Sequence, residues 1–268
     1  MTATPPSDPS DRGSPNPATF HDHFSGHAAE YARFRPHYPA SLFADLAALC
    51  PHRDAAWDCG TGNGQAAVAL AEYFKRVFAT DASAQQIGQA ILNPRVSYRV
   101  ANERHSGLDN DSIDLVTVAQ ALHWFDTAAF FAEVQRVLRP GGVIAVWCYG
   151  LHRLGEPFDA VLHHFYAETV GADWPPERVL VEQGYRTIPF PFEELPPPVA
   201  AMEQELSLDG LLNYLSTWSA VKRYEKRVGF SPLNVLEKKL LPLWGDRHQP
   251  RPAVWPISVR VGRKVPQG

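Results

Sequence analysis

Residues 57–64 read Trp-Asp-Cys-Gly-Thr-Gly-Asn-Gly and carry residue types well suited to holding a small ligand. Glycine has no Cβ atom, so three alternating glycines let the backbone turn sharply and approach a ligand closely. The helix expected after them presents unpaired backbone N–H groups to a negatively charged group. Asp58, two positions before the first glycine, adds a hydrogen-bond acceptor. The segment therefore predicts a ligand-binding turn between a strand and a helix.

The spacing of these glycines separates two classes of cofactor. Dinucleotide-binding folds use G-x-G-x-x-G to hold a pyrophosphate. Here the pattern is G-x-G-x-G, and Gln65 stands where the wider pattern needs its third glycine. The spacing disfavours a nicotinamide-dependent oxidoreductase, which stays open as an alternative.

A second carboxylate follows at the interval expected for a ribose-binding acid. Residues 76–81, Arg-Val-Phe-Ala-Thr-Asp, predict a buried strand that ends at Asp81, 21 positions after Gly60. An acid at about this distance in a βαβ unit binds ribose hydroxyls, and an ionised carboxylate accepts stronger hydrogen bonds than a neutral group. The alternative is that Asp81 only caps a helix that starts near Ser83.

Further strands and helices must position these groups. Residues 96–100 predict a third strand and residues 112–119 another buried strand, and residues 120–126, Gln-Ala-Leu-His-Trp-Phe-Asp, continue the latter into the crevice where open α/β sheets bind ligands. Next come an expected helix over 128–138, a break at Arg-Pro-Gly-Gly over 139–142, and an apolar strand over 143–147. Alternating strands and helices predict an α/β fold with a parallel sheet.

Together these motifs resemble class I S-adenosylmethionine-dependent methyltransferases of the small-molecule type, over most of the chain. The resemblance rests on DCGTGNG at 58–64, Asp81, ALHWFD at 121–126 and RVLRPGGVIAVW at 136–147. It implies a Rossmann-like fold with a mostly parallel seven-stranded sheet, helices on both faces and an antiparallel last strand. It also implies S-adenosyl-L-methionine as cofactor and S-adenosyl-L-homocysteine as product.

Within that class, residues 24–36 with Tyr38 and Pro39 resemble the N-terminal element of trans-aconitate methyltransferase-like proteins. Segments 174–178, 184–187 and 214–219 extend this resemblance. It implies that the second half of the chain contains a substrate lid and the strands that complete the sheet.

Carried over position by position, the resemblance places the cofactor at the ends of the first two strands. Asp58 is implied to accept a hydrogen bond from the ammonium group of the cofactor, directly or through water. Gly60, Thr61 and Gly62 form the turn beside it. Asp81 is implied to bind both ribose hydroxyls.

The remaining implied cofactor contacts come from other elements. Ala82 would line the adenine, and Asn102 and Glu103 would lie near its amino group, although Glu103 departs from the commoner pattern of an acid followed by a hydrophobic residue and proline. The other implied contacts are Gln120 near the methionine portion, and Tyr31 and Arg35 folded over the cofactor.

The expected reaction is in-line attack by an oxygen or nitrogen of a small molecule on the sulfonium methyl group, with the protein supplying alignment. A carboxylate acceptor needs no general base. A hydroxyl or an amine needs one, and His123 is then the candidate, although it could instead only form hydrogen bonds. The predicted substrate contacts are Trp124, Arg186 and Trp218.

An anionic acceptor would be bound by one or more arginines. The candidates are Arg33, Arg178, Arg186 and Arg223, each of which could instead be a surface residue. Four aromatic residues could line the pocket or belong to the core, and these are Trp174, Tyr185, Tyr214 and Trp218.

Composition disfavours several other partners. A net charge of −4 and a pI near 6.2 provide no basic field for nucleic acid. No apolar stretch approaches the roughly 20 residues that span a bilayer, and three cysteines without C-x-x-C spacing favour a reducing cytoplasm. No metal is expected, because His21, His23 and His27, and the adjacent His163 and His164, lack the spacing of a closed site.

The expected organisation is a flexible tail over 1–18 and one domain over 19–268. That domain comprises a helical cap over 19–52, a cofactor-binding core over 53–150, and a substrate-lid and sheet-completing region over 151–268. Ser41 is predicted to cap a helix over 42–49. Later helices are expected over 156–170, 208–216, 220–228 and 233–240, with a final strand over 253–261. A cofactor-binding module without catalysis is the remaining alternative, and the oligomeric state stays open.

Overall fold

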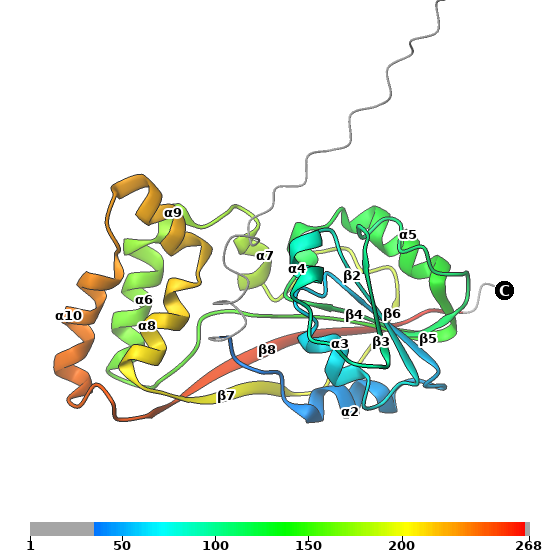
Figure 1. The fold of residues 1–268 in the computed structure, drawn as a ribbon, viewed down its shortest axis with the longest axis horizontal. Coiled ribbons are helices and arrows are strands. Elements are labelled where there is room, and N and C mark those ends of the chain that lie inside the picture. The colour runs from blue at the N-terminus through cyan, green and yellow to red at the C-terminus, as the bar shows by residue number, and fades with distance from the viewer. Residues whose placement is uncertain (1–34, 266–268) are drawn as a thin grey trace, which may run out of the picture.

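The computed structural model describes residues 35–265, and these form one mixed sheet of eight strands with helices around it (Figure 1). The strand order is β3-β2-β1-β4-β5-β8-β6, and β7 also pairs with β8. Strands β1 to β5 pair with one another in parallel, whereas β8 is antiparallel to β5, β6 and β7. The strands are β1 (Ala55–Cys59), β2 (Arg76–Asp81), β3 (Val96–Val100), β4 (Ile113–Ala119), β5 (Leu138–Tyr149), β6 (Glu193–Leu195), β7 (Ala200–Leu206) and β8 (Arg251–Arg263).

The sheet has eight strands, and not the predicted seven, because two strands pair with the same edge of β8. β6 pairs with residues 261–263 of β8, and β7 pairs with residues 251–257. Three consecutive prolines, 196–198, lie between them and lack the N–H that a sheet ladder needs. The predicted mostly parallel sheet with an antiparallel last strand is therefore confirmed, with its edge strand interrupted.

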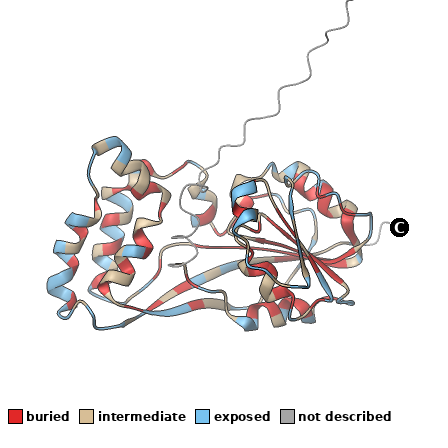
Figure 2. Cartoon of the chain, in the orientation of Figure 1, coloured by how far each residue is buried: buried red, intermediate tan, exposed pale blue. Residues whose placement is uncertain are grey.

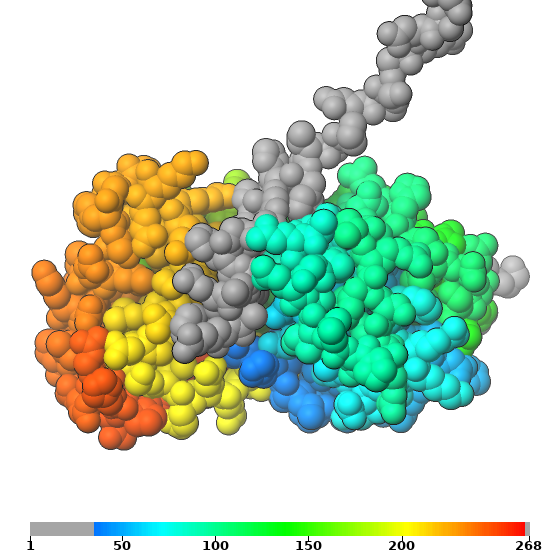
Figure 3. Space-filling view, viewed as in Figure 1, coloured from blue at the N-terminus to red at the C-terminus, as the bar shows by residue number. Residues whose placement is uncertain are grey.

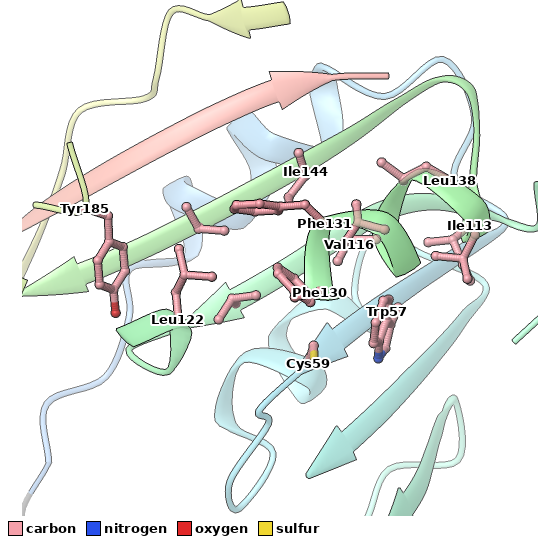
Figure 4. Close-up of a cluster of buried hydrophobic side chains, with 14 of the residues drawn as sticks. Trp57, Cys59, Ile113, Val116, Leu122, Phe130, Phe131, Leu138, Ile144 and Tyr185 are labelled. Atoms are coloured by element: carbon pink, nitrogen blue, oxygen red, sulfur yellow. The ribbon is translucent and has the colours of Figure 1, made fainter. Parts of the chain in front are cut away.

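Helices cover both faces of the sheet, because successive residues of a strand point to opposite sides. Val116 of β4 packs in a cluster with Phe130 and Phe131, whereas its neighbour Leu115 packs with residues of α2 and α3 on the other face. Figure 4 shows the first cluster, and Figure 2 shows the buried residues concentrated along the central strands. The helices of this part are α2 (Ala40–Ala48), α3 (Gln65–Leu70), α4 (Ala84–Gly88), the 3-10 helix η2 (Leu122–Trp124), α5 (Thr127–Val137) and α7 (Arg178–Glu182).

A second group of helices lies at the other end of the molecule (Figures 1 and 3). Leu211, Leu215 and Leu240 of this group form a third buried cluster with Trp255 of β8. Val261 of the same strand packs in the cluster that contains α2 and α3, so β8 joins the two ends of the fold. The helices are α6 (Phe158–His164), the π-helix η3 (Phe165–Thr169), the 3-10 helix η4 (Gly171–Asp173), α8 (Leu208–Ser216), α9 (Ser219–Val228) and α10 (Leu233–Trp244).

Most predicted elements are present with small shifts of their ends. The strands over 76–81 and 96–100 and the helix over 208–216 match the structure residue for residue. The final strand is longer than predicted, at Arg251–Arg263. The predicted tail over 1–18 and most of the predicted N-terminal cap lie outside the described residues.

Three local predictions are wrong. The strand over 112–119 does not continue through 120–126, because Gln120 has a φ of 56° and residues 122–124 form η2. Ser41 does not cap a helix, since α2 already begins at Ala40 and its N-cap position is Pro39. The helix ends before residues 139–142 as predicted, at Val137, but the strand does not wait until residue 143, because β5 already begins at Leu138.

Candidate active site

The turn between β1 and α3 requires glycine at two positions. Gly60, Gly62 and Gly64 have positive φ angles of 70°, 57° and 88°. A Cβ atom at Gly60 would lie 2.7 Å from Cβ of Ala121, and one at Gly64 would lie 2.2 Å from the phenol oxygen of Tyr98. Both contacts are too close for a side chain. Both glycines therefore let the turn pack closely on its neighbours at the carboxyl edge of the sheet, where open α/β sheets bind ligands.

Asp81 lies at the end of β2 and joins the first two strand ends. Its carboxylate accepts from the backbone N–H of Gly62 at 2.9 Å and of Ser83 at 2.8 Å. The N-cap of α4 is Ser83, whose hydroxyl accepts from the N–H of Gln86, so Asp81 is not the capping residue. Each carboxylate oxygen can accept more than one hydrogen bond, and Asp81 and Ala82 are both partly exposed.

Asp58 is fully buried beneath the glycine turn. Its two carboxylate oxygens accept from the hydroxyls of Thr61 at 2.6 Å and Thr117 at 2.7 Å. Burial raises its pKa to about 6, against the opposing effect of these two hydroxyls. This geometry gives Asp58 a direct part in holding the turn, since Thr61 is one of the turn residues.

Asn102 and Glu103 follow β3 on the same edge of the sheet. Oδ1 of Asn102 accepts from the backbone N–H of Arg104 and of His105, both at 3.1 Å. The carboxylate of Glu103 forms an ion pair with Arg104 at 3.3 Å. Both side chains order the loop after β3, and their implied adenine contacts stay predictions.

Gln120 and Arg35 converge on Tyr149, the last residue of β5. The side-chain amide of Gln120 pairs with the backbone of Tyr149, and Nη1 of Arg35 donates to the phenol oxygen of Tyr149 at 2.8 Å. Tyr31, predicted to act with Arg35, lies outside the described residues.

His123 lies in η2 and is held from behind by Tyr185. Its Nδ1 is 2.8 Å from the phenol oxygen of Tyr185, and its ring centroid is 4.7 Å from that of Trp124. Burial, followed by the positive charge of Arg178, lowers the pKa of His123 to about 3. The imidazole is therefore neutral at pH 7, and it is a weak base.

A pocket opens at the carboxyl ends of β4 and β5, beside the glycine turn that packs on Ala121. Of the predicted cofactor, catalytic and substrate residues, Arg35, Gln120, His123, Trp124 and Trp218 line it. The other lining residues are Tyr149, Gly150, Trp174, Pro175, Arg178, Tyr214 and Ser219. None of these residues is acidic, so the described wall of the pocket consists of aromatic faces and hydrogen-bond donors.

The four candidate arginines fall into different surroundings. Arg178 lines the pocket, where Nε donates to the phenol oxygen of Tyr166 at 2.7 Å and the guanidinium lies 4.5 Å from the ring of Trp174. Arg186 is exposed, and neither it nor Arg223 is among the residues that line the pocket. Arg33 lies outside the described residues.

The predictions missed some lining residues that the strand-end rule could have found. Tyr149 and Gly150 come at the end of β5, as Gln120 comes at the end of β4, and ligands collect beyond the carboxyl ends of such strands. Among the four ambiguous aromatics, Trp174, Tyr214 and Trp218 line the pocket, and the last two also belong to a buried cluster, whereas Tyr185 belongs to the core alone.

Residues 35–265 contain neither a cluster of metal ligands nor a helix that could span a membrane. No three histidine, cysteine, aspartate or glutamate side chains in this part of the chain come together as metal ligands would. None of the helices there combines the length and apolar character that crossing a bilayer requires.

Comparison with known proteins agrees with this geometry. A methyltransferase domain family matches residues 57–146, which run from β1 to β5. A Dictyostelium discoideum protein described as a methyltransferase is 35% identical over 231 residues, which are 85% of this chain and 88% of that protein. A Saccharomyces cerevisiae protein described as an S-adenosylmethionine-dependent methyltransferase is 29% identical over 131 residues, covering 46% of this chain and 45% of that protein.

A solved structure extends the likeness to the whole fold. It is described as a type II methyltransferase from Anaeromyxobacter dehalogenans and superposes with a TM-score of 0.83 at 47% identity, covering 87% of this chain and all of its own. Because both this structure and the Dictyostelium relative align over most of the chain, the protein belongs to the class I S-adenosylmethionine-dependent methyltransferases.

Proposed function

We propose that this enzyme transfers a methyl group from S-adenosyl-L-methionine to an oxygen or nitrogen atom of a small-molecule acceptor. The observation that carries the proposal is the adjacency of the glycine turn and the pocket, through the contact of Gly60 with Ala121 between Gln120 and Leu122. A cofactor at the turn would therefore have its reactive end beside the pocket. The cofactor supplies an activated methyl group, and the protein aligns the acceptor with it.

The residues at the strand ends fit that cofactor. Asp81 offers a carboxylate at the end of β2 for the ribose hydroxyls, and Gly62, where an added Cβ would have only the side chain of Gln86 within 4 Å, leaves room for close approach. Asp58 supports the turn from below through Thr61. Ala82, Asn102 and Glu103 complete the proposed adenine side.

The pocket supports a small acceptor that carries a negative charge. Arg35 and Arg178 bring two guanidinium groups to it, and no carboxylate among the described residues forms an ion pair with Arg178. Trp124, Trp174 and Trp218 add aromatic faces. A carboxylate acceptor, as in the trans-aconitate methyltransferase-like proteins that the sequence resembles, suits this lining.

Titration calorimetry with S-adenosyl-L-homocysteine, on the full chain and on Asp81→Ala, tests the proposed cofactor. We expect saturable one-site binding that weakens at least tenfold in the variant, because a charge-assisted hydrogen bond is worth about 1.5–3 kcal/mol. Absence of binding by the folded wild-type protein would contradict the proposed cofactor site. Turnover of a panel of small carboxylates, phenols and amines then tests the acceptor.

A further inference from the structure

Tyr185 is a buried tyrosine whose position the fold fixes closely. It has no exposed surface, and its hydroxyl points toward the short helix at Leu122 (Figure 4). Gly184 and Tyr185 have consecutive positive φ angles of 59° and 60°. A bulky residue rarely adopts this conformation, and it persists only where its surroundings hold it. The turn therefore places the phenol beside His123 in a backbone conformation that is unfavourable for tyrosine.

The burial of the phenol decides which partner donates the proton in the Tyr185–His123 hydrogen bond. Burial, followed by Cys148, raises the pKa of Tyr185 well above its usual value, so the phenol keeps its proton. A buried hydroxyl proton is rarely left without a hydrogen-bond partner, so the phenol proton of Tyr185 needs an acceptor.

Nδ1 of His123 is the acceptor within reach, at 2.8 Å. The thiol of Cys148 is already directed to the carbonyl of Val181, at 3.6 Å. If Nδ1 accepts the phenol proton, a neutral imidazole carries its own proton on Nε2. His123 lines the pocket, and Nε2 has no hydrogen-bond partner among residues 35–265, so Nε2 is the nitrogen left for a bound molecule.

We propose that Tyr185 fixes His123 as its Nε2–H tautomer, so that His123 donates a hydrogen bond that orients the acceptor molecule and does not remove a proton from it. This inference rests on the proposed function of the pocket. The lowered pKa of His123, caused by burial and then by Arg178, agrees with a permanently neutral ring. The general-base role considered from the sequence is thereby replaced by a positioning role.

The proposal narrows the choice of acceptor atom. No aspartate or glutamate is among the described residues that line the pocket. An ammonium or a hydroxyl acceptor must lose a proton, and these residues include no carboxylate that could take it. A carboxylate acceptor needs no base. Its oxygen bonds to the methyl carbon while the carbon–sulfur bond breaks and sulfur keeps the electron pair, and no proton leaves. We therefore expect O-methylation of an acceptor that is already ionised.

Nuclear magnetic resonance of the full chain labelled with ¹⁵N-histidine tests the tautomer directly. Long-range ¹H–¹⁵N correlations distinguish the two neutral tautomers and the imidazolium, and His123→Gln identifies the signals of His123 by their loss. We expect a bare Nδ1 and a protonated Nε2, unchanged from about pH 5.5 to 8.5. A proton on Nδ1, or an imidazolium at pH 7, would overturn the proposal.

Tyr185→Phe tests whether the phenol fixes the tautomer, since it removes one oxygen and keeps the ring. We expect the Nδ1 signal of His123 to move toward a mixture of tautomers. Tyr73→Phe is the matched control, because its hydroxyl bonds to the carbonyl of Ala40, away from the pocket. If Tyr185→Phe folds and the tautomer of His123 is unchanged, Tyr185 does not fix that tautomer. If the variant does not fold, the wild-type spectrum still shows which tautomer His123 adopts.

Benzoate and benzylamine, which differ mainly in the charge beside the ring, test the donor role in the presence of S-adenosyl-L-homocysteine. We expect benzoate to shift the Nε2–H resonance of His123 and benzylamine to leave it in place, and the reverse pattern would overturn the proposal. The tautomer spectrum is recorded without ligand, so it can contradict the proposed tautomer whether or not the cofactor binds. Calorimetry tests binding of the cofactor separately.

Discussion

Gln120 and Tyr149 are joined by two hydrogen bonds between a side chain and the backbone. Nε2 of Gln120 donates to the carbonyl of Tyr149 at 3.1 Å, and the N–H of Tyr149 donates to Oε1 of Gln120 at 2.8 Å. Gln120 has a φ of 56°, and its backbone N–H donates to the carbonyl of Trp147 at 2.9 Å, so both its backbone and its side chain bond to β5 beyond the end of β4. The pair holds together the two strand ends beside which the pocket opens.

Two replacements of Gln120 distinguish the stability that these hydrogen bonds contribute from the cost of its backbone strain. Gln120→Ala loses both bonds and keeps a Cβ atom at positive φ, so we expect it to lower the free energy of unfolding by roughly 1–3 kcal/mol. Gln120→Gly loses the same bonds but relieves the strain, so it should be about 1 kcal/mol more stable than the alanine variant. Urea denaturation measures both, and equal stability of the two variants would argue against strain at this residue.

Gly60→Ala tests the close approach of the cofactor turn. Its Cβ would lie 2.7 Å from Cβ of Ala121 at a φ of 70°, so the turn must shift. We expect affinity for S-adenosyl-L-homocysteine to fall at least tenfold, as measured by calorimetry. Gly88→Ala is the matched control, because a Cβ there meets nothing within 4 Å inside α4 and should leave binding unchanged. Equal affinities of the two variants would contradict a role for the turn in binding.

The sequence predicted the part of the fold in which local patterns suffice. The glycine spacing, the acid at Asp81 and the apolar runs of β1 and β4 all lie within a few residues of the feature that they predict. The helix at Leu208–Ser216 was equally local, with Ser207 capping it through the N–H of Gly210. Such signals depend little on the rest of the chain.

The acceptor side of the site could not be predicted in the same way. Arg178 and Arg186 are equally plausible from sequence, yet one lines the pocket and the other is exposed, because α7 and the turn at Gly184 point them apart. The tautomer of His123 depends on Tyr185, which is 62 positions away in the chain. Long-range packing decides both.

Asp58 should make stability depend on pH in a way that Asp58→Asn removes. Burial raises its folded pKa to about 6, above the unfolded value near 3.9, so the folded state binds the proton more tightly. The stability that protonation gives is full below about pH 4 and is lost as pH rises through 6, a loss of roughly 3 kcal/mol. Urea denaturation of both proteins across this range measures the difference, and parallel pH profiles would contradict a raised pKa.

Arg178→Met and Arg186→Met form a matched pair for acceptor binding. Arg178 lines the pocket, and its guanidinium is held over Trp174 and by Tyr166, whereas Arg186 is exposed and outside the lining. For a carboxylate acceptor identified by screening, we expect Arg178→Met to raise KM roughly tenfold to a hundredfold, because a hydrogen bond between charged groups is worth about 1.5–3 kcal/mol. Arg186→Met should leave KM within about twofold of wild type, since surface substitutions change energies by roughly 0.5 kcal/mol or less. Steady-state kinetics measures KM for both variants. A KM that rises in Arg186→Met and not in Arg178→Met would place the acceptor outside this pocket, whereas the expected rise in Arg178→Met alone would assign carboxylate recognition to α7.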